Sequence, residues 1–266
     1  MKALLGDYPV TKHFKETSGL QFADVKLPQT AFKRVVRDLE FDMAELAVVT
    51  FLLARAHGKP YRLLPAVVTA RFQHPYLVSV KGLKPKDLEG KRVGQRSYSV
   101  TTATWVRGML AEDYGVDLEK IRWVTFEEPH VAEFRDPPNV ERMPAGKDMT
   151  AMLLAGELDA AIMGEVPKDE RCKPVFPDIP AAVEAWKKKH GASVQLNHMV
   201  TVKDTVSKEK ADEIYRGLLE SRRMAGEPPM NPFGLEENRR NLEAAIDCVF
   251  RQRMIPRRFS VEELLR

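Results

Sequence analysis

The sequence predicts an α/β protein of two lobes, with helices gathered towards its carboxyl end. Short apolar runs of strand length alternate with stretches of helical period, the order expected for β-α-β units and a largely parallel sheet. A polar segment with Gly and Pro at residues 81–90 indicates a crossover to a second lobe. The strand expected at residues 194–202 would return the chain to the first lobe.

The first lobe begins with a short strand. Residues 1–8 hold only a three-residue apolar run before Asp7, whereas a secretory signal needs about 7 to 15 apolar residues, so we expect a strand and no leader. The further strands expected in this lobe are residues 22–27, 43–46, 63–68 and 74–80, and the helices between them are residues 30–39 and 48–57.

The second lobe contains a longer helix near its start. Ser99 or Thr101 is expected to cap this helix, which runs to about Tyr114 and stops at Gly115. The other strands expected are residues 92–94, 121–126 and 160–163, with a long loop at 127–147, a short helix from Asp148 to Gly156, and helices at 179–190, 208–224, 235–254 and 261–266. We therefore expect lobe 1 to comprise residues 1–82 and 195–266, and lobe 2 residues 83–194.

Composition excludes several classes of protein. Of 266 residues, 44% are hydrophobic and 30% charged, a balance that excludes disorder and fibrous repeats. The net charge of +4 is spread too evenly for a nucleic-acid-binding surface, whereas a few local arginines suit a small anionic ligand. No run approaches the ~18 to 20 apolar residues of a membrane span. The two cysteines form no disulfide framework, so we expect a cytoplasmic protein and leave a homo-oligomer open.

Several stretches resemble one known family. The chain is similar to 4,5-dihydroxyphthalate decarboxylase and its relatives, which have the periplasmic-binding-protein type 2 fold with a central cleft between two lobes. The matching stretches are residues 41–46 (FDMAEL), 98–108 (YSVTTATWVRG), 156–160 (GELDA), 197–198 (NH) and 232–265. The chain departs from the family at Arg96-Ser97, where Pro-Glu is common, at Thr102 in place of Ala, and at Met199 in place of Thr.

The resemblance implies a cofactor-independent decarboxylase, a lyase whose substrate is a hydroxylated aromatic carboxylate or dicarboxylate such as 4,5-dihydroxyphthalate. Aromatic decarboxylation needs a carboxylate moved out of water and an acid that protonates the ring carbon as carbon dioxide leaves. A histidine that titrates near neutrality suits the acid. Arginine suits a second carboxylate, because its planar fork binds both oxygens.

Histidines supply the candidate proton donors. His198 stands beside Asn197 at the return crossover, in a stretch that matches the family, and is the first candidate. His74 follows Arg71 near the end of the first lobe, and His13 is expected on a loop facing the cleft. For each histidine the alternative is a structural residue with satisfied hydrogen bonds, and for Arg71 it is a solvated surface charge.

A second group of candidates surrounds the start of the helix at residue 101. Arg96, Tyr98, Thr101 and Thr102 would combine positive charge, hydroxyl groups and exposed helix N–H groups to hold a carboxylate. Plain N-capping would explain the hydroxyl groups but not Tyr98 and Arg96. Glu45 lies between apolar residues and is expected either in the cleft or paired with a lysine or arginine.

No motif for a metal or a cofactor is evident. Acidic residues and a histidine cluster at residues 127–133, but their spacing matches no known metal pattern and solvated charge is the simpler reading. A glycine-rich phosphate loop and a Gly-x-Ser-x-Gly elbow are both absent from the sequence. Two other functions stay open: a solute-binding protein that captures a small anion, and another lyase on the same fold.

Overall fold

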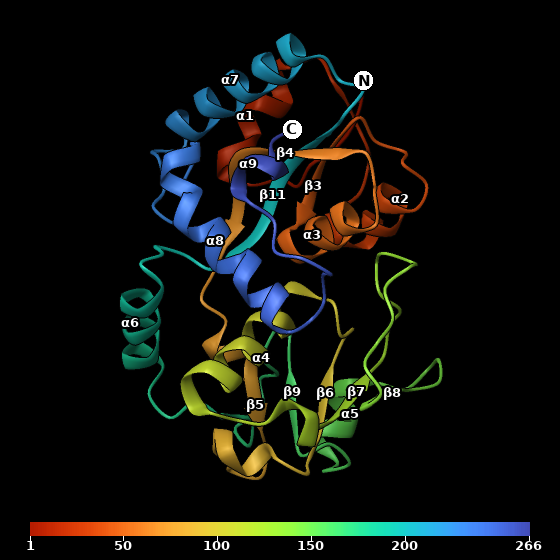
Figure 1. Cartoon of the computed structure of the whole chain (residues 1–266), viewed down its shortest axis with the longest axis vertical. Coiled ribbons are helices and arrows are strands. Elements are labelled where there is room, and N and C mark those ends of the chain that lie inside the picture. The colour runs from red at the N-terminus through yellow and green to blue at the C-terminus, as the bar shows by residue number, and fades with distance from the viewer. The chain divides into compact units, whose positions relative to one another are not determined.

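The computed structural model describes residues 1–266 and divides into two compact units, each with its own sheet. Unit 1 comprises Met1–Arg71 and Ala192–Arg266, and unit 2 comprises Phe72–Gly191 (Figure 1). The first unit is therefore discontinuous in sequence. Its first boundary lies earlier than residue 82, because β5 (Leu77–Ser79) pairs with β9 (Ala160–Ile162) in the sheet of unit 2.

Unit 1 is built on a five-stranded sheet in the order β2-β1-β3-β11-β4. Its strands are β1 (Lys2–Leu4), β2 (Gln21–Phe22), β3 (Met43–Ala47), β4 (Tyr61–Ala70) and β11 (Leu196–Lys203). β11 runs antiparallel to both β3 and β4, so the carboxyl ends of β1, β3 and β4 meet the start of β11 at one edge. We call this the carboxyl edge of unit 1.

Most elements expected in unit 1 are confirmed. Its helices are α1 (Pro9–Thr17), α2 (Phe32–Val36), α3 (Val48–Ala56), α7 (Lys208–Met224), α8 (Leu235–Arg251) and α9 (Val261–Leu264), with a 3-10 turn at Pro28–Ala31. The prediction of a strand at residues 22–27 is wrong beyond Phe22, where β2 ends. The chain turns there, because the N–H of Val25 donates to the carbonyl of Ala23 and not to a neighbouring strand.

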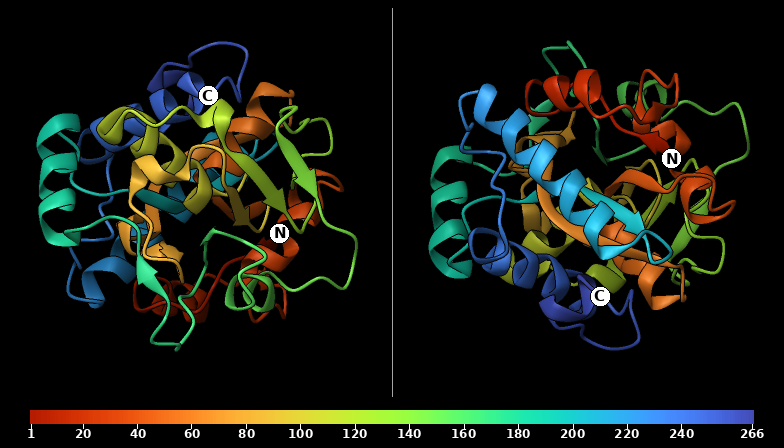
Figure 2. Two further views of the ribbon diagram at one scale, coloured as in Figure 1. Left: turned by 90° about the horizontal axis from the view of Figure 1, so that it is seen from below. Right: turned by 90° about the horizontal axis from the view of Figure 1, so that it is seen from above.

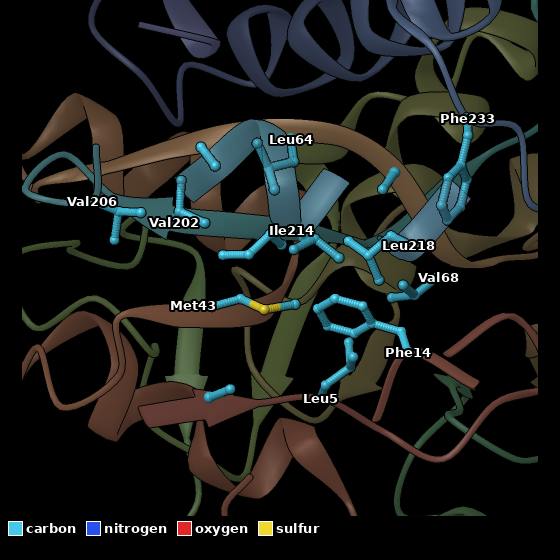
Figure 3. Close-up of a cluster of buried hydrophobic side chains, with 14 residues drawn as sticks. Leu5, Phe14, Met43, Leu64, Val68, Val202, Val206, Ile214, Leu218 and Phe233 are labelled. Carbon is cyan, nitrogen blue, oxygen red and sulfur yellow. The ribbon is translucent and has the colours of Figure 1, made fainter. Parts of the chain in front are cut away.

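The core of unit 1 forms where α1 and α7 cover one face of the sheet. Phe14 of α1 shares one buried apolar cluster with Ile214 and Leu218 of α7 and with the strand residues Met43 and Val202 (Figure 3). In the view from above, α7 lies across β4 and β11 (Figure 2). Apolar residues at helical spacing on α7 and at alternate positions in the strands thus account for this layer.

Unit 2 has a six-stranded sheet in the order β10-β5-β9-β6-β7-β8. The strands not yet bounded are β6 (Arg92–Gln95), β7 (Arg122–Thr125), β8 (Val140–Arg142) and β10 (Lys173–Pro174). β9, β6, β7 and β8 are parallel, whereas β5 and β10 are antiparallel to their partners. β8 lies inside the segment expected to be a loop, and the strand expected at residues 74–80 begins with a 3-10 turn at His74–Tyr76.

The helices of unit 2 are α4 (Thr101–Tyr114), α5 (Met149–Leu154) and α6 (Ile179–His190), with 3-10 turns at Pro85–Leu88 and Leu118–Lys120. Gly115 ends α4 with a φ of 62°, as predicted. The predicted cap is wrong: the N-cap is Val100, whose side chain makes no capping hydrogen bond. In neither unit is there a helix with the length and apolar character needed to span a bilayer.

Candidate active site

Glu45 is a fully buried carboxylate in the middle of β3, where its four strand neighbours are apolar. Its Oε2 accepts the N–H of Gly6 at 2.8 Å, and its Oε1 accepts the hydroxyl of Tyr8 at 2.7 Å and bonds Nδ1 of His198 at 2.6 Å. A buried charge is costly unless it is hydrogen-bonded or paired. These three partners therefore explain how a glutamate is tolerated there, and neither the lysine nor the arginine considered from the sequence is among them.

His198 lies in β11 directly opposite Ala47, two residues beyond Glu45 in β3. Because a carboxylate only accepts hydrogen bonds, Nδ1 is the protonated nitrogen of this pair and Nε2 is the nitrogen left for proton exchange. The edge of Phe32 packs against the imidazole with ring centroids 5.2 Å apart. The side chain keeps 16% of its surface exposed, so the imidazole is held in place yet reachable.

Tyr8 joins this pair to the first turn of α1, of which it is the N-cap. Burial and the adjacent carboxylate of Glu45 raise the pKa of the Tyr8 hydroxyl, so it remains a donor. Thr11 fixes the turn, because its Oγ1 accepts the N–H of Tyr8 and donates to the carbonyl of Gly6. The group formed by Glu45, His198 and Tyr8, which we call the triad, is therefore anchored from three elements.

A cavity of about 390 Å³ lies at the same carboxyl edge. Its walls are residues 8–10 at the start of α1, residues 68–70 at the end of β4, and Ala225, Pro228 and Asn231 between α7 and α8. Tyr8 is common to the cavity and the triad. None of the residues that line the cavity is charged.

Unit 2 has its own group of polar side chains at the carboxyl ends of β6 and β7. Ser97 Oγ, Thr125 Oγ1 and Gln95 Nε2 are buried and make no hydrogen bond. Gln95 and Thr125 are paired across β6 and β7 and so point to the same face of the sheet. Gln95 Oε1 accepts Nη1 of Arg107 from α4 at 2.6 Å, so this is the face that α4 covers.

The structure places the other candidates near α4 in different surroundings. Tyr98 is buried with its ring centroid 3.7 Å from the guanidinium of Arg107, as part of an aromatic core. Thr101 and Thr102 occupy the first turn of α4, the former buried and the latter partly exposed. Arg96 is partly exposed and lies 3.7 Å from Glu127.

Three other candidates are not members of the triad. His74 belongs to unit 2 and not to the first lobe as expected; it is 1% exposed, and burial lowers its pKa to about 4. His13 lies within α1 and not on a loop. Arg71 ends the first segment of unit 1, where its N–H donates to the carbonyl of Gln195.

Asn197 is next to His198 in β11. The ladder between β11 and β4 shifts register on both sides of His198, and such irregularities re-aim side chains at strand ends. No group of three or more His, Cys, Asp or Glu side chains in the chain is placed to hold a metal ion.

Tyr8 and the cavity were not predicted from the sequence. A usable signal exists, because Gly6 and Pro9 bracket Tyr8 between a strand and a helix that begins with proline. Such a strand-to-helix turn lies at the carboxyl edge of a parallel sheet, where ligands bind in open α/β folds.

The fold is that of the periplasmic binding proteins, as the resemblance implied. The chain aligns over 99% of its length with the alkanesulfonate-binding protein SsuA of Xanthomonas axonopodis, at a TM-score of 0.55 and 13% identity, covering 96% of that protein. The periplasmic aliphatic sulphonate binding protein SsuA of Escherichia coli aligns over 100% of this chain and 96% of its own, at a TM-score of 0.56 and 10% identity. Identities this low show the fold alone.

Curated relatives carry a more specific name. The 4,5-dihydroxyphthalate decarboxylase of Comamonas testosteroni is 29% identical over 204 residues, which cover 68% of this chain and 60% of that protein. The enzyme of the same name from Pseudomonas putida is 32% identical over 151 residues, covering 53% of this chain and 58% of that protein. The chain thus spans less than two thirds of the length of these relatives. No family model matches it.

Proposed function

We propose that the chain is a cofactor-independent decarboxylase whose substrate is a hydroxylated aromatic carboxylate or dicarboxylate such as 4,5-dihydroxyphthalate. The observation that carries this proposal is the 2.6 Å contact between Nδ1 of His198 and the buried carboxylate of Glu45. That pairing supplies an oriented acid, which is the group that aromatic decarboxylation requires. The similarity to two proteins named as such decarboxylases supports it.

The reaction can be written with the atoms of this pair. A ring hydroxyl ortho or para to the reacting position donates electron density, and the carbon bearing the carboxylate takes a proton from Nε2 of the imidazolium form of His198. The bond between that carbon and the carboxylate then breaks, its electron pair restores the aromatic ring, and carbon dioxide leaves. Neutral His198 regains its proton from water. Glu45 stabilises the imidazolium and fixes its orientation throughout.

We further propose that the start of α4, together with the neighbouring Ser97, binds a carboxylate. Ser97, Thr101 and Thr102 lie at this position, where the N-cap side chain makes no capping hydrogen bond and the first turn of α4 has no acidic residue. Helix N–H groups and the helix dipole favour an anion at such a position. Ser97 stands where the family often has glutamate, and a hydroxyl removes the repulsion that a second negative charge would impose.

The proposed reaction takes place in the cytoplasm, in the breakdown of aromatic acids. Neither Cys172 nor Cys248 takes part in a disulfide bond, as is usual for proteins of a reducing compartment. Arg71 and Arg96 remain candidates for a second carboxylate.

Carbon dioxide release from hydroxylated phthalates and benzoates tests the proposal. We expect turnover by the unaltered chain and a kcat that is about 10²- to 10⁴-fold lower in His198→Gln. The control His13→Gln, which changes a histidine outside the triad, should keep the kcat of the unaltered chain. Tight binding of an aromatic acid with no carbon dioxide released would instead identify a solute-binding protein.

A further inference from the structure

The hydroxyl of Tyr8 and the imidazole of His198 bind the same oxygen atom of Glu45. Oε1 accepts the hydroxyl at 2.7 Å and lies 2.6 Å from Nδ1 of the imidazole, whereas Oε2 accepts the N–H of Gly6 at 2.8 Å. A carboxylate oxygen offers about two lone pairs. Both lone pairs of Oε1 are therefore occupied, and each donor takes part of the electron density that the other donor would otherwise receive.

The hydroxyl of Tyr8 donates to Glu45 and not to the carboxylate that is its neighbour in the sequence. The side chain of Asp7 is 88% exposed and forms an ion pair with Lys15. Tyr8 instead reaches Oε1 of Glu45, which lies 37 residues further along the chain. Burial and the charge of Glu45 raise the pKa of the hydroxyl, so the hydroxyl keeps its proton and donates it to Oε1 in a hydrogen bond.

The ring of Tyr8 is held in place directly over Gly6. A Cβ atom on Gly6 would lie 2.6 Å from Cε2, Cζ and Oη of Tyr8, which is closer than packed atoms allow. Gly6 is not among the glycines with a positive φ, so the tyrosine ring, and not the backbone conformation, requires glycine here. Thr11 joins both ends of this turn, because its Oγ1 accepts the N–H of Tyr8 and donates to the carbonyl of Gly6. The turn therefore fixes where the hydroxyl lies.

From this geometry we infer that Tyr8 is a positioning residue: its hydroxyl, held over Gly6, fixes the orientation of Glu45 and weakens the hydrogen bond between Oε1 and His198. For its effect on the reaction the inference rests on the proposed function. If Oε1 accepted the imidazole alone, it would bind the imidazolium more strongly and slow the transfer of the proton from Nε2. A carboxylate without the hydroxyl would also be less firmly oriented. Both effects lower the rate.

Tyr8→Phe removes the hydroxyl and keeps the ring. We expect kcat to fall about three- to tenfold, the effect of one hydrogen bond that acts through a second residue, with KM nearly unchanged. The NMR resonance of the Nδ1 proton of His198, identified by its loss in His198→Gln, should move downfield because Oε1 then accepts a single donor. Tyr61→Phe is the matched control, since it removes a buried hydroxyl that donates to the carbonyl of Phe41 at 2.7 Å. It should leave both kcat and the resonance unchanged.

Gly6→Ala tests the same contact without removing the hydroxyl. The added methyl group should displace the outer end of the tyrosine ring, because this side chain can rotate more easily than the backbone can move. We expect the resonance of His198 to move as it does in Tyr8→Phe. The double variant of Gly6→Ala with Tyr8→Phe should lose no more kcat than Tyr8→Phe alone, since both changes break one hydrogen bond. Gly164→Ala, where a Cβ atom would meet nothing within 4 Å, is the control.

An unmoved resonance in both Tyr8→Phe and Gly6→Ala would overturn the inference, even if the thermal stability of these variants fell. An unchanged kcat in Tyr8→Phe of an active chain would overturn it too. The resonance does not depend on turnover. A chain that releases no carbon dioxide, but in which both variants move the resonance, would therefore reject the proposed reaction and support the effect of Tyr8 on the pair of Glu45 and His198.

Discussion

Nδ1 of His198 lies 2.6 Å from Oε1 of Glu45, although 153 residues separate them in the sequence. The same Oε1 accepts the hydroxyl of Tyr8, so one buried oxygen connects β3, β11 and the start of α1. A histidine held in this way has one tautomer and one ring orientation. In the proposed reaction Glu45 is therefore a positioning residue, and its role can be tested separately from that of His198.

Glu45→Gln is expected to lower kcat by about 10- to 100-fold, the loss associated with one charge-assisted hydrogen bond. KM should change little, because Glu45 is buried and is bonded to protein groups. The double variant with His198→Gln should be no slower than His198→Gln alone, since both changes disable the same unit. Steady-state kinetics on the four proteins checks this, and additive losses would contradict a shared role.

Ser97→Ala should raise KM for an aromatic carboxylate about three- to tenfold with kcat nearly unchanged, because a neutral donor at a binding position is lost. Ser97→Glu should raise KM further, since it places a negative charge at the start of α4. Ser18→Ala in unit 1 is the control. Equal KM values for Ser97→Ala and Ser97→Glu would show that the substrate carboxylate does not bind beside Ser97.

The buried imidazole of His74 should make the stability of the protein depend on pH. Burial lowers its pKa from 6.5 to about 4, so between these values the unfolded chain binds a proton that the folded chain does not. The free energy of unfolding should therefore fall as pH drops from 6.5 to 4, by up to about 3 kcal/mol from this residue. Urea unfolding across that range should show that the free energy of unfolding depends less steeply on pH in His74→Gln than in the unaltered chain. If the free energies of the two proteins changed with pH in parallel, the pKa of His74 would not be lowered.

The close contact between Gly217 of α7 and Phe14 leads us to expect that a larger residue at position 217 destabilises the protein. A Cβ atom at this position would lie 2.8 Å from Cδ2 of Phe14, tighter than packed atoms allow. Gly217→Ala gains about 1 kcal/mol of helix propensity but overpacks the core at a cost of about 1 to 3 kcal/mol, so we expect a net loss near 1 kcal/mol. Chemical denaturation measures it. Phe14→Leu in the same chain should recover part of the loss.

Elements with strong local patterns were predictable from the sequence. The bounds of α6 and α7, the αL end of α4 at Gly115, and the cap of α5 by Asp148 all follow from neighbouring residues. The cap of α4 was not predictable in this way. Ser99 and Thr101 are both good capping residues, yet Val100 occupies the position, so sequence preference gave way to the path of the chain out of β6.

Long-range partners explain what the sequence left undetermined at the candidate site. His198 and Glu45 were each recognisable, as a histidine in a family-like stretch and as a charge among apolar neighbours. Their contact depends on β11 inserting between β3 and β4, which no local period encodes. Tyr8 was missed for the same reason, since its role arises only when β1 and β3 lie side by side.

The position of β11 in the sheet also determines when unit 1 can complete its fold during synthesis. The nascent chain delivers β1 to β4 first, then all of residues 72–191, and only afterwards the strand that separates β3 from β4. Until then Glu45 lacks its imidazole partner and the sheet lacks the strand between β3 and β4. Unit 1 is therefore expected to mature late in translation, after unit 2 has already emerged, which assigns the assembly of the triad to one of the last folding events of the chain.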